Sequence, residues 1–175
     1  KRIFVLKKDT LNISEKNNYK VCEVGAVLDK NIINHSKNKK NSKEYFSLLV
    51  LGGSQGAKIF GLVIPQVTKM LKDKGYNIKI AQQCIEDQIE VLKDFYSENN
   101  IQSNIFNFRN DILDLILSSD LAITRSGASS SAELVHAMLP FVAVPLPDSI
   151  DNHQYINAKY YEKMGCCWVL EQNNF

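Results

Sequence analysis

FSLLVLGGSQGA, residues 46–57, is an apolar run of strand length that leads into a glycine-rich turn. A short, continuous apolar run bounded by glycine is typical of a strand that is buried on both faces of a parallel sheet. Residues 57–74 then place apolar side chains at helical spacing, and Gly75 is suited to end a helix. Strand, glycine turn and helix in this order predict the first part of a βαβ unit.

The same alternation continues along the rest of the chain. Further strands are predicted at residues 78–81, 104–108, 121–124, 141–144 and 167–170, and further helices at 85–96, 112–117, 130–138 and 153–164. Short strands that alternate with helices form right-handed crossovers, which build a parallel sheet with helices on both faces. We therefore expect an α/β fold in which residues 46–175 form a doubly wound, Rossmann-like parallel sheet.

The stretch before this alternation has a different character. Residues 37–45 are polar, rich in lysine and aperiodic, which predicts a linker or loop. Two earlier apolar runs, at residues 3–6 and 21–24, predict short strands.

The composition indicates a globular protein and argues against several kinds of partner. Of the 175 residues, 45% are hydrophobic and 23% charged, and the formal net charge of +2 is too small to indicate nucleic acid binding. No apolar run approaches the ~20 residues of a membrane span, and no signal peptide is recognisable. The 4 cysteines include the neighbours Cys166 and Cys167 but no CxxC pair. We therefore expect reduced thiols in a cytoplasmic protein.

Ligands on doubly wound sheets bind beyond the carboxyl ends of the strands, and the first loop in such a position is Gly52–Gly56. Its glycines allow a close backbone approach, the next helix offers free N–H groups, and Ser54 and Gln55 add donors, which together favour a phosphate group. The loop is not GxGxxG, and no lysine directly follows Gly56 as in a P-loop. The alternative is a tight strand-to-helix turn without a ligand.

The second such loop is RSGASSSAE, residues 125–133. Arg125 ends a strand, where a cation can meet a diphosphate, and the following small residues open a helix with accessible N–H groups. Glu133, in the first or second helical turn, can accept hydrogen bonds from both hydroxyls of a ribose. Ser130 and Glu133 also have the spacing of a capping box, which is a local helix-start device. The spacing alone favours neither interpretation.

The third loop is DNHQYINA, residues 151–158. Gln154 and Asn157 are three residues apart and so share one face of the predicted helix. Side-chain amides both donate and accept hydrogen bonds, which suits sugar hydroxyls. His153 is interpreted as structural. Because these loops offer no Ser/His/Asp set, carboxylate pair or metal-ligand spacing, we predict no catalytic residue, metal site or cofactor in this chain.

Together, GGSQGA (52–57), RSGA…E (125–133) and DNHQ…NA (151–158) resemble the motifs of the C-terminal domain of the MurG-type glycosyltransferases, in the same order and spacing. The resemblance spans residue 46 to about residue 165. It implies the C-terminal half of a GT-B glycosyltransferase, in which two Rossmann-like domains face each other across a cleft. Residues 1–36 are then the end of the preceding domain or interdomain strands, 37–45 the linker or loop, and 46–175 a nucleotide-sugar-binding domain that is incomplete at its C-terminus.

The resemblance also implies roles for individual residues in binding UDP-GlcNAc. They are, for the diphosphate, Gly53, Ser54, Gln55, Arg125, Ser126 and Gly127; for the ribose, Glu133; for GlcNAc, Gln154 and Asn157; and for the uracil edge, the backbone of Arg109.

Two features depart from the family pattern. Residues 25–29 read GAVLD where the family has Gly-Asn-Pro-Val-Arg, so Asp29 replaces an arginine that would neutralise the diphosphate. The acceptor-binding domain, which would supply the catalytic base, is not part of this sequence. The chain by itself is therefore expected to be inactive.

The function implied by the resemblance is an inverting, metal-independent transfer of GlcNAc from UDP-GlcNAc to lipid I, which gives lipid II for peptidoglycan synthesis. Lipid I would bind through the missing domain, with peripheral contact at the cytoplasmic face of the bacterial inner membrane, and no nucleic acid is expected as partner. Two alternatives are a stand-alone donor subunit of a split GlcNAc transferase and a non-catalytic nucleotide-sugar-binding relic.

Overall fold

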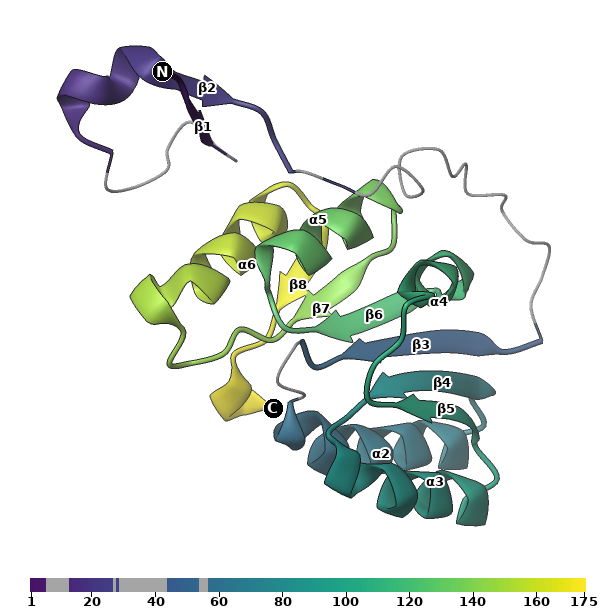
Figure 1. The fold of residues 1–175 in the computed structure, drawn as a ribbon. Helices are drawn as coiled ribbons and strands as arrows, with labels where there is room; N and C mark the ends of the chain where they lie inside the picture. The colour runs from purple at the N-terminus through teal and green to yellow at the C-terminus, as the bar shows by residue number, and fades with distance from the viewer. Residues whose placement is uncertain (6–12, 27, 29–43, 54–56) are drawn as a thin grey trace.

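A six-stranded parallel sheet forms the centre of the computed structural model, which describes residues 1–5, 13–26, 28, 44–53 and 57–175 (Figure 1). The strand order is β5-β4-β3-β6-β7-β8, and every pairing is parallel. The strands are β3 (Phe46–Leu51), β4 (Ile78–Gln83), β5 (Gln102–Phe106), β6 (Leu121–Thr124), β7 (Phe141–Ala143) and β8 (Cys167–Val169). The chain thus moves outward from β3 in one direction and returns to continue in the other, which is the doubly wound order. The predicted fold class is confirmed.

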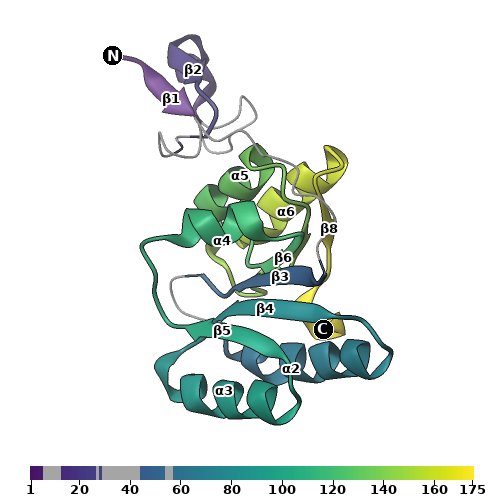
Figure 2. The same ribbon diagram turned by 90° about the vertical axis from the view of Figure 1, so that its right-hand side faces the viewer.

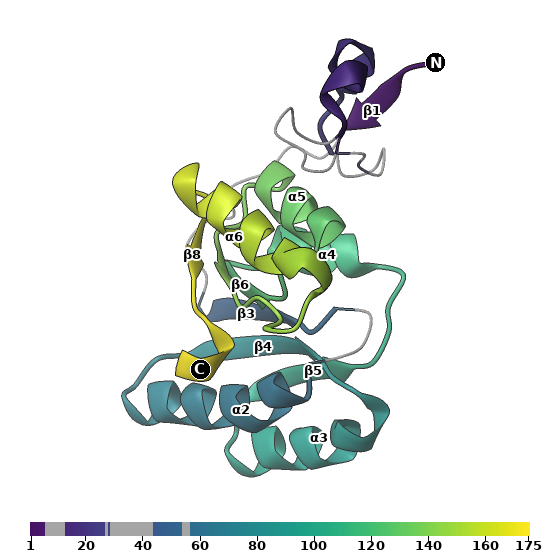
Figure 3. The ribbon, with the colours of Figure 1, turned by 90° about the vertical axis from the view of Figure 1, so that its left-hand side faces the viewer.

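Helices cover both faces of this sheet. On one face lie α2 (Lys58–Asp73) and α3 (Ile89–Glu98), and on the other lie α4 (Ile112–Ser118), α5 (Ala128–His136) and α6 (His153–Lys163) (Figures 2 and 3). Short 3-10 helices precede α3 (η2, Glu86–Gln88) and α6 (η3, Ile150–Asn152), and another follows β8 (η4, Gln172–Asn174). No helix in the described ranges is both long and apolar enough to cross a bilayer.

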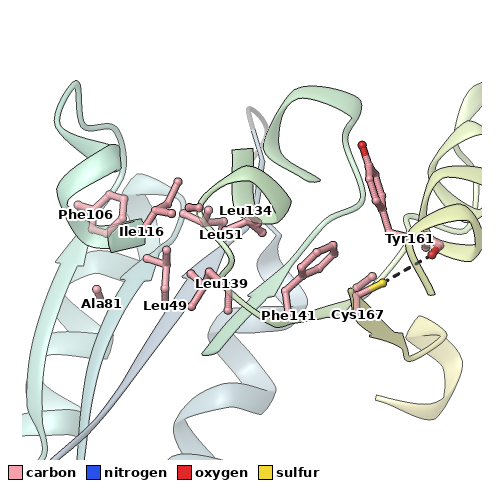
Figure 4. Packing of buried hydrophobic residues seen from close by; sticks show 14 residues of the cluster. Leu49, Leu51, Ala81, Phe106, Ile116, Leu134, Leu139, Phe141, Tyr161 and Cys167 are labelled. Atoms are coloured by element: carbon pink, nitrogen blue, oxygen red, sulfur yellow. Dashed lines mark hydrogen bonds between the residues drawn. The ribbon is translucent and has the colours of Figure 1, made fainter. Parts of the chain in front are cut away.

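The central strand β3 sends its side chains alternately into two cores. Leu49 and Leu51 pack with residues of α4, α5 and α6 (Figure 4), whereas Leu48 and Val50 pack with α2 and α3. All four side chains are buried. Because both faces are covered, every position of the strand gains from an apolar side chain, which explains the continuous apolar run in the sequence.

The N-terminal segment forms a separate, two-stranded parallel sheet of β1 (Ile3–Val5) and β2 (Val21–Glu23), with η1 (Glu15–Lys20) before β2 (Figures 1–3). The two predicted strands are present. Residues 37–43 of the predicted linker lie outside the described residues, and the proposed division into domains stays a prediction. The four cysteines form no disulfide; Cys84 and Cys167 are buried, whereas Cys22 and Cys166 are only partly buried.

Several predicted boundaries differ from the structure, and two of them lie beside the predicted loops. A strand was expected at residues 104–108, but β5 ends at Phe106, because Phe106 pairs with the last residue of β4. A helix was expected from Ser130, but α5 begins at Ala128, since the carbonyl of Gly127 already accepts the Ser131 N–H at 3.0 Å. Ser130 therefore lies inside the helix, and the capping-box interpretation of Ser130 and Glu133 is wrong.

A buried polar network ties α2 and α3 to the sheet. Gln82 of β4 is 0% exposed; its Nε2 donates to the carbonyl of Phe60 at 3.2 Å, and its Oε1 accepts the Tyr96 hydroxyl at 2.6 Å. Burial raises the pKa of the Tyr96 hydroxyl, which keeps it a donor. Phe60 lies in the first turn of α2, so this network holds the start of the helix that follows the glycine loop.

We expect Tyr96→Phe to lower the free energy of unfolding by ~1–3 kcal/mol, because the buried Oε1 of Gln82 loses its donor. Urea denaturation of the purified chain measures this. Tyr76→Phe is the matched control, since Tyr76 is 60% exposed, and should change stability by less than ~0.5 kcal/mol. Equal stability of the two variants would contradict a structural role for the network.

Candidate functional site

The topological switch point lies between β3 and β6, where the chain changes direction across the sheet. The register pairs Leu51 with Thr124, the last residues of the two strands. The N–H of Arg125 continues this pairing and donates to the carbonyl of Leu51 at 3.2 Å. The first and second predicted loops therefore leave the sheet side by side.

The loop after β3 takes a backbone conformation that favours glycine. Gly53 has φ +77°, and a Cβ there would lie 3.9 Å from Cβ of Arg125. Residues with positive φ are usually glycine because other side chains clash with the backbone. The loop leads directly into α2, which starts at Lys58. Ser54 and Gln55, predicted to contact the diphosphate, lie outside the described residues, so their roles stay predictions.

The loop after β6 places buried hydroxyls at the start of α5. Ser126 and Ser131 are 0% exposed, and their Oγ atoms have no hydrogen-bond partner within the described residues. The N-cap residue is Gly127, which has no side chain to satisfy the first-turn amides. Since buried hydroxyls nearly always have a partner and helix N-termini attract anions, this arrangement is suited to a phosphate. Glu133, half-buried, lies in the second turn of the same helix.

The start of α6 is tied to both neighbouring loops. Nδ2 of Asn157 donates to the carbonyl of Ser126 at 3.3 Å, and Oε1 of Gln154 accepts the N–H of Leu146 at 3.0 Å. Within the described residues, Oδ1 of Asn157 and Nε2 of Gln154 make no further hydrogen bond and can face a ligand. Nδ1 of His153 contacts the carbonyl of Ile150 at 2.7 Å, which agrees with its interpretation as structural.

Arg125 is buried: only 9% of its surface is exposed, less than for a residue that binds phosphate at the protein surface. Its NH1 donates to the carbonyls of Val144 and Pro145 at 3.0 and 3.2 Å, and its NH2 donates to Oε1 of Gln172 at 2.6 Å. The guanidinium carbon lies 5.0 Å from the ring centroid of Phe60. Burial lowers the pKa of this guanidinium. The described partners of Arg125 are neutral, and its contact with a diphosphate stays a prediction.

Arg109 lies at the carboxyl end of β5, two strands away from β3. Its Nε donates to Oδ1 of Asp111 at 2.7 Å and its NH2 to Oδ2, and this pairing lowers the pKa of the Asp111 carboxyl. Within the described residues, the N–H and C=O of Arg109 form no backbone hydrogen bond. The contact of this backbone with the uracil edge stays a prediction.

A pocket of about 360 Å³ lies beside the third loop. Its walls are the segment after β7, the start of α6 and the segment after β8; the lining residues are Pro145, Leu146, Pro147, Asn152, Tyr155, Glu171, Gln172 and Asn173. Sequence reasoning missed Glu171–Asn173. A polar run after the last strand carries no local signal, and only the fold brings it to the other loops.

Comparison with known sequences assigns a family. The glycosyltransferase family 28 C-terminal domain matches residues 47–175. A relative from Pelagibacter ubique, named UDP-N-acetylglucosamine–N-acetylmuramyl-(pentapeptide) pyrophosphoryl-undecaprenol N-acetylglucosamine transferase, is 42% identical over 160 residues, which are 91% of this chain and 44% of the relative. A relative of the same name from Rickettsia canadensis is 37% identical, over 99% of this chain and 50% of its own length. The chain thus spans about half the length of these relatives.

Solved structures agree with this assignment. MurG of Acinetobacter baumannii has a TM-score of 0.74 and 27% identity, over 89% of this chain and 47% of that one. The glycotransferase of kitacinnamycin, with a TM-score of 0.63 and 16% identity over 97% of this chain and 42% of its own, shares the fold. With the doubly wound sheet and the three loops at its switch point, the family match over residues 47–175 shows that this chain belongs to glycosyltransferase family 28 and carries its C-terminal domain.

Proposed function

We propose that this chain is the UDP-GlcNAc-binding part of a transferase that converts lipid I to lipid II in peptidoglycan synthesis. The names of the relatives support the reaction. The observation that carries the assignment to donor binding is the meeting of three loops at one sheet edge. The pairing of Leu51 with Thr124 joins the first two loops, and the hydrogen bond from Asn157 to Ser126 joins the second and third.

In this proposal the diphosphate lies between the N-termini of α2 and α5. Gly53 lets the backbone approach closely, and Ser126 and the uncapped first turn after Gly127 supply donors. When the acceptor hydroxyl attacks the anomeric carbon, the bond to the diphosphate oxygen breaks on the opposite face and the configuration inverts. Negative charge then grows on the leaving UDP, where oriented N–H groups stabilise it more than in the ground state.

The remaining contacts orient the donor. Glu133 accepts the two ribose hydroxyls, and the backbone of Arg109 pairs with the uracil edge. Gln154 and Asn157 use the amide atoms left unpaired in the described structure to bind GlcNAc hydroxyls. In this proposal the uracil lies at the β5 side of the switch point and the sugar at the β7 side.

The other half of the reaction is assigned to protein outside this chain, because the chain spans about half the length of its relatives. That half would bind lipid I and supply the base that deprotonates its attacking hydroxyl. A lipid-linked acceptor also implies peripheral contact with the cytoplasmic face of the inner membrane.

We expect the chain to bind UDP and UDP-GlcNAc at least about tenfold more tightly than uridine, because charge-assisted hydrogen bonds to the diphosphate carry much of the affinity. Isothermal titration calorimetry of the purified chain measures all three. If uridine bound as tightly as UDP, the phosphate role of Gly53, Ser126 and Gly127 would be wrong.

Glu133→Ala should lower the affinity for UDP by ~1.5–3 kcal/mol, the range for hydrogen bonds to a charged group. The variant should bind 2′,3′-dideoxy-UDP as well as the unaltered chain does, since that ligand lacks both hydroxyls. Glu98→Ala, an exposed site at the end of α3, is the matched control and should leave the affinity unchanged. Unchanged UDP binding by Glu133→Ala, with the fold verified by urea denaturation, refutes the ribose assignment.

The chain alone should transfer no GlcNAc to a lipid I analogue, because the acceptor site and the base are assigned to the other half. The assay uses labelled UDP-GlcNAc and follows the labelled product. Turnover in the ordinary enzymatic range of ~1–1000 per second would mean that this chain holds a complete active site.

A further inference from the structure

The side chain of Arg125 connects two of the segments that surround the sugar side of the site. It reaches the carbonyls of Val144 and Pro145 after β7 and the side chain of Gln172 after β8. Its Cβ is also close to Gly53, in the loop after β3: a Cβ added to Gly53 would lie 3.9 Å from it. Residues 125 and 172 are 47 positions apart in the chain, so this contact exists only in the folded protein.

The segment after β7, which Arg125 binds, also contacts Gln154, a predicted sugar-binding residue. Pro145, whose carbonyl accepts from NH1 of Arg125, precedes Leu146, whose N–H donates to Oε1 of Gln154. The position of the Gln154 amide is therefore coupled to Arg125 through two adjacent residues. A shift of this segment would displace the amide that we assign to the sugar.

The same guanidinium joins two walls of the 360 Å³ pocket. One wall is Pro145–Pro147, which Arg125 binds through NH1, and the other is Glu171–Asn173, which it binds through NH2. The lining combines amide groups, a tyrosine ring and the Glu171 carboxylate. A carboxylate in the wall repels phosphate, whereas amides and aromatic faces suit a neutral, hydroxyl-bearing ligand.

A guanidinium is the group that can make this connection. Its N–H donors are fixed in one plane, and three of the five are already directed at neutral oxygens. Lysine carries the same charge but on a single nitrogen, which cannot reach all three acceptors in this geometry. The substitution Arg125→Lys therefore keeps the positive charge but removes the connection between the segments.

We propose that Arg125, together with Gln172, is a positioning residue for the sugar part of the donor and not a ligand of the diphosphate. It holds the segments after β7 and β8 together and thereby fixes the pocket and the Gln154 amide. This inference rests on the proposed function, because it assumes that the loops at the switch point bind a nucleotide sugar.

The test compares dissociation constants for UDP and UDP-GlcNAc in the unaltered chain, Arg125→Lys and Gln172→Leu. In both variants the dissociation constant for UDP-GlcNAc should rise about tenfold, and that for UDP by no more than about twofold. The double variant should bind no more weakly than Arg125→Lys alone, because that substitution already removes the hydrogen bond that Gln172→Leu removes. Gln172→Glu should restore binding to within about threefold, because its carboxylate accepts the same hydrogen bond.

Gln66→Leu, the same substitution at an exposed site on α2, is the control and should change neither constant. Thermal unfolding identifies variants that do not fold; if Arg125→Lys is one, Gln172→Leu and Gln172→Glu complete the test. If Arg125→Lys weakened the binding of UDP and UDP-GlcNAc equally, while Gln172→Leu changed neither, Arg125 would be a ligand of the diphosphate. That result would overturn the proposal. If all variants weakened the binding of both ligands equally, the proposal would also be wrong, because the substitutions would then destabilise the protein as a whole. Failure of the unaltered chain to bind UDP would instead refute the proposed function.

Discussion

The parallel pairing of β3 with β6 is the interaction on which the rest of the structure depends. Leu48–Leu51 are buried from both faces, so β3 can sit only at the centre of the sheet. The register that pairs Leu51 with Thr124 then brings two strand ends level. A slip of one residue would exchange the side chains facing the two cores and separate the loops, so burial specifies the register strongly. The site is thus a consequence of how the core is packed.

Buried polar groups near the sheet divide into two kinds, according to whether the protein satisfies them. Gln82 and Arg125 have protein partners and hold helices or loops in place. Ser126 and Ser131 are equally buried, but their hydroxyls have no partner within the described residues. Leaving a buried donor unpaired costs about 1–3 kcal/mol. These two hydroxyls lie at the start of α5, next to the first-turn amides that the N-cap residue Gly127 leaves without a side-chain acceptor.

The proposed division of labour between the two halves of the enzyme has a physical basis. Every described loop that we assign to the donor follows the carboxyl end of a strand in one sheet, so all the proposed donor contacts come from one domain. An inverting displacement needs the acceptor on the opposite face of the sugar from the diphosphate. A second domain that faces this edge can place it there.

The sequence by itself determined the alternation of strands and helices, the buried strand at residues 46–51 and the positions of the three loops, since hydrophobic periodicity and glycine turns are local properties of the chain. The family motifs lie in those same loops. Only the tertiary structure decided that α5 starts at Ala128, which removed the capping box, and that Arg125 binds Gln172. A guanidinium and a side-chain amide can pair with many acceptors and donors. Which ones they meet depends on segments that packing brings together, and no local pattern in the chain records that.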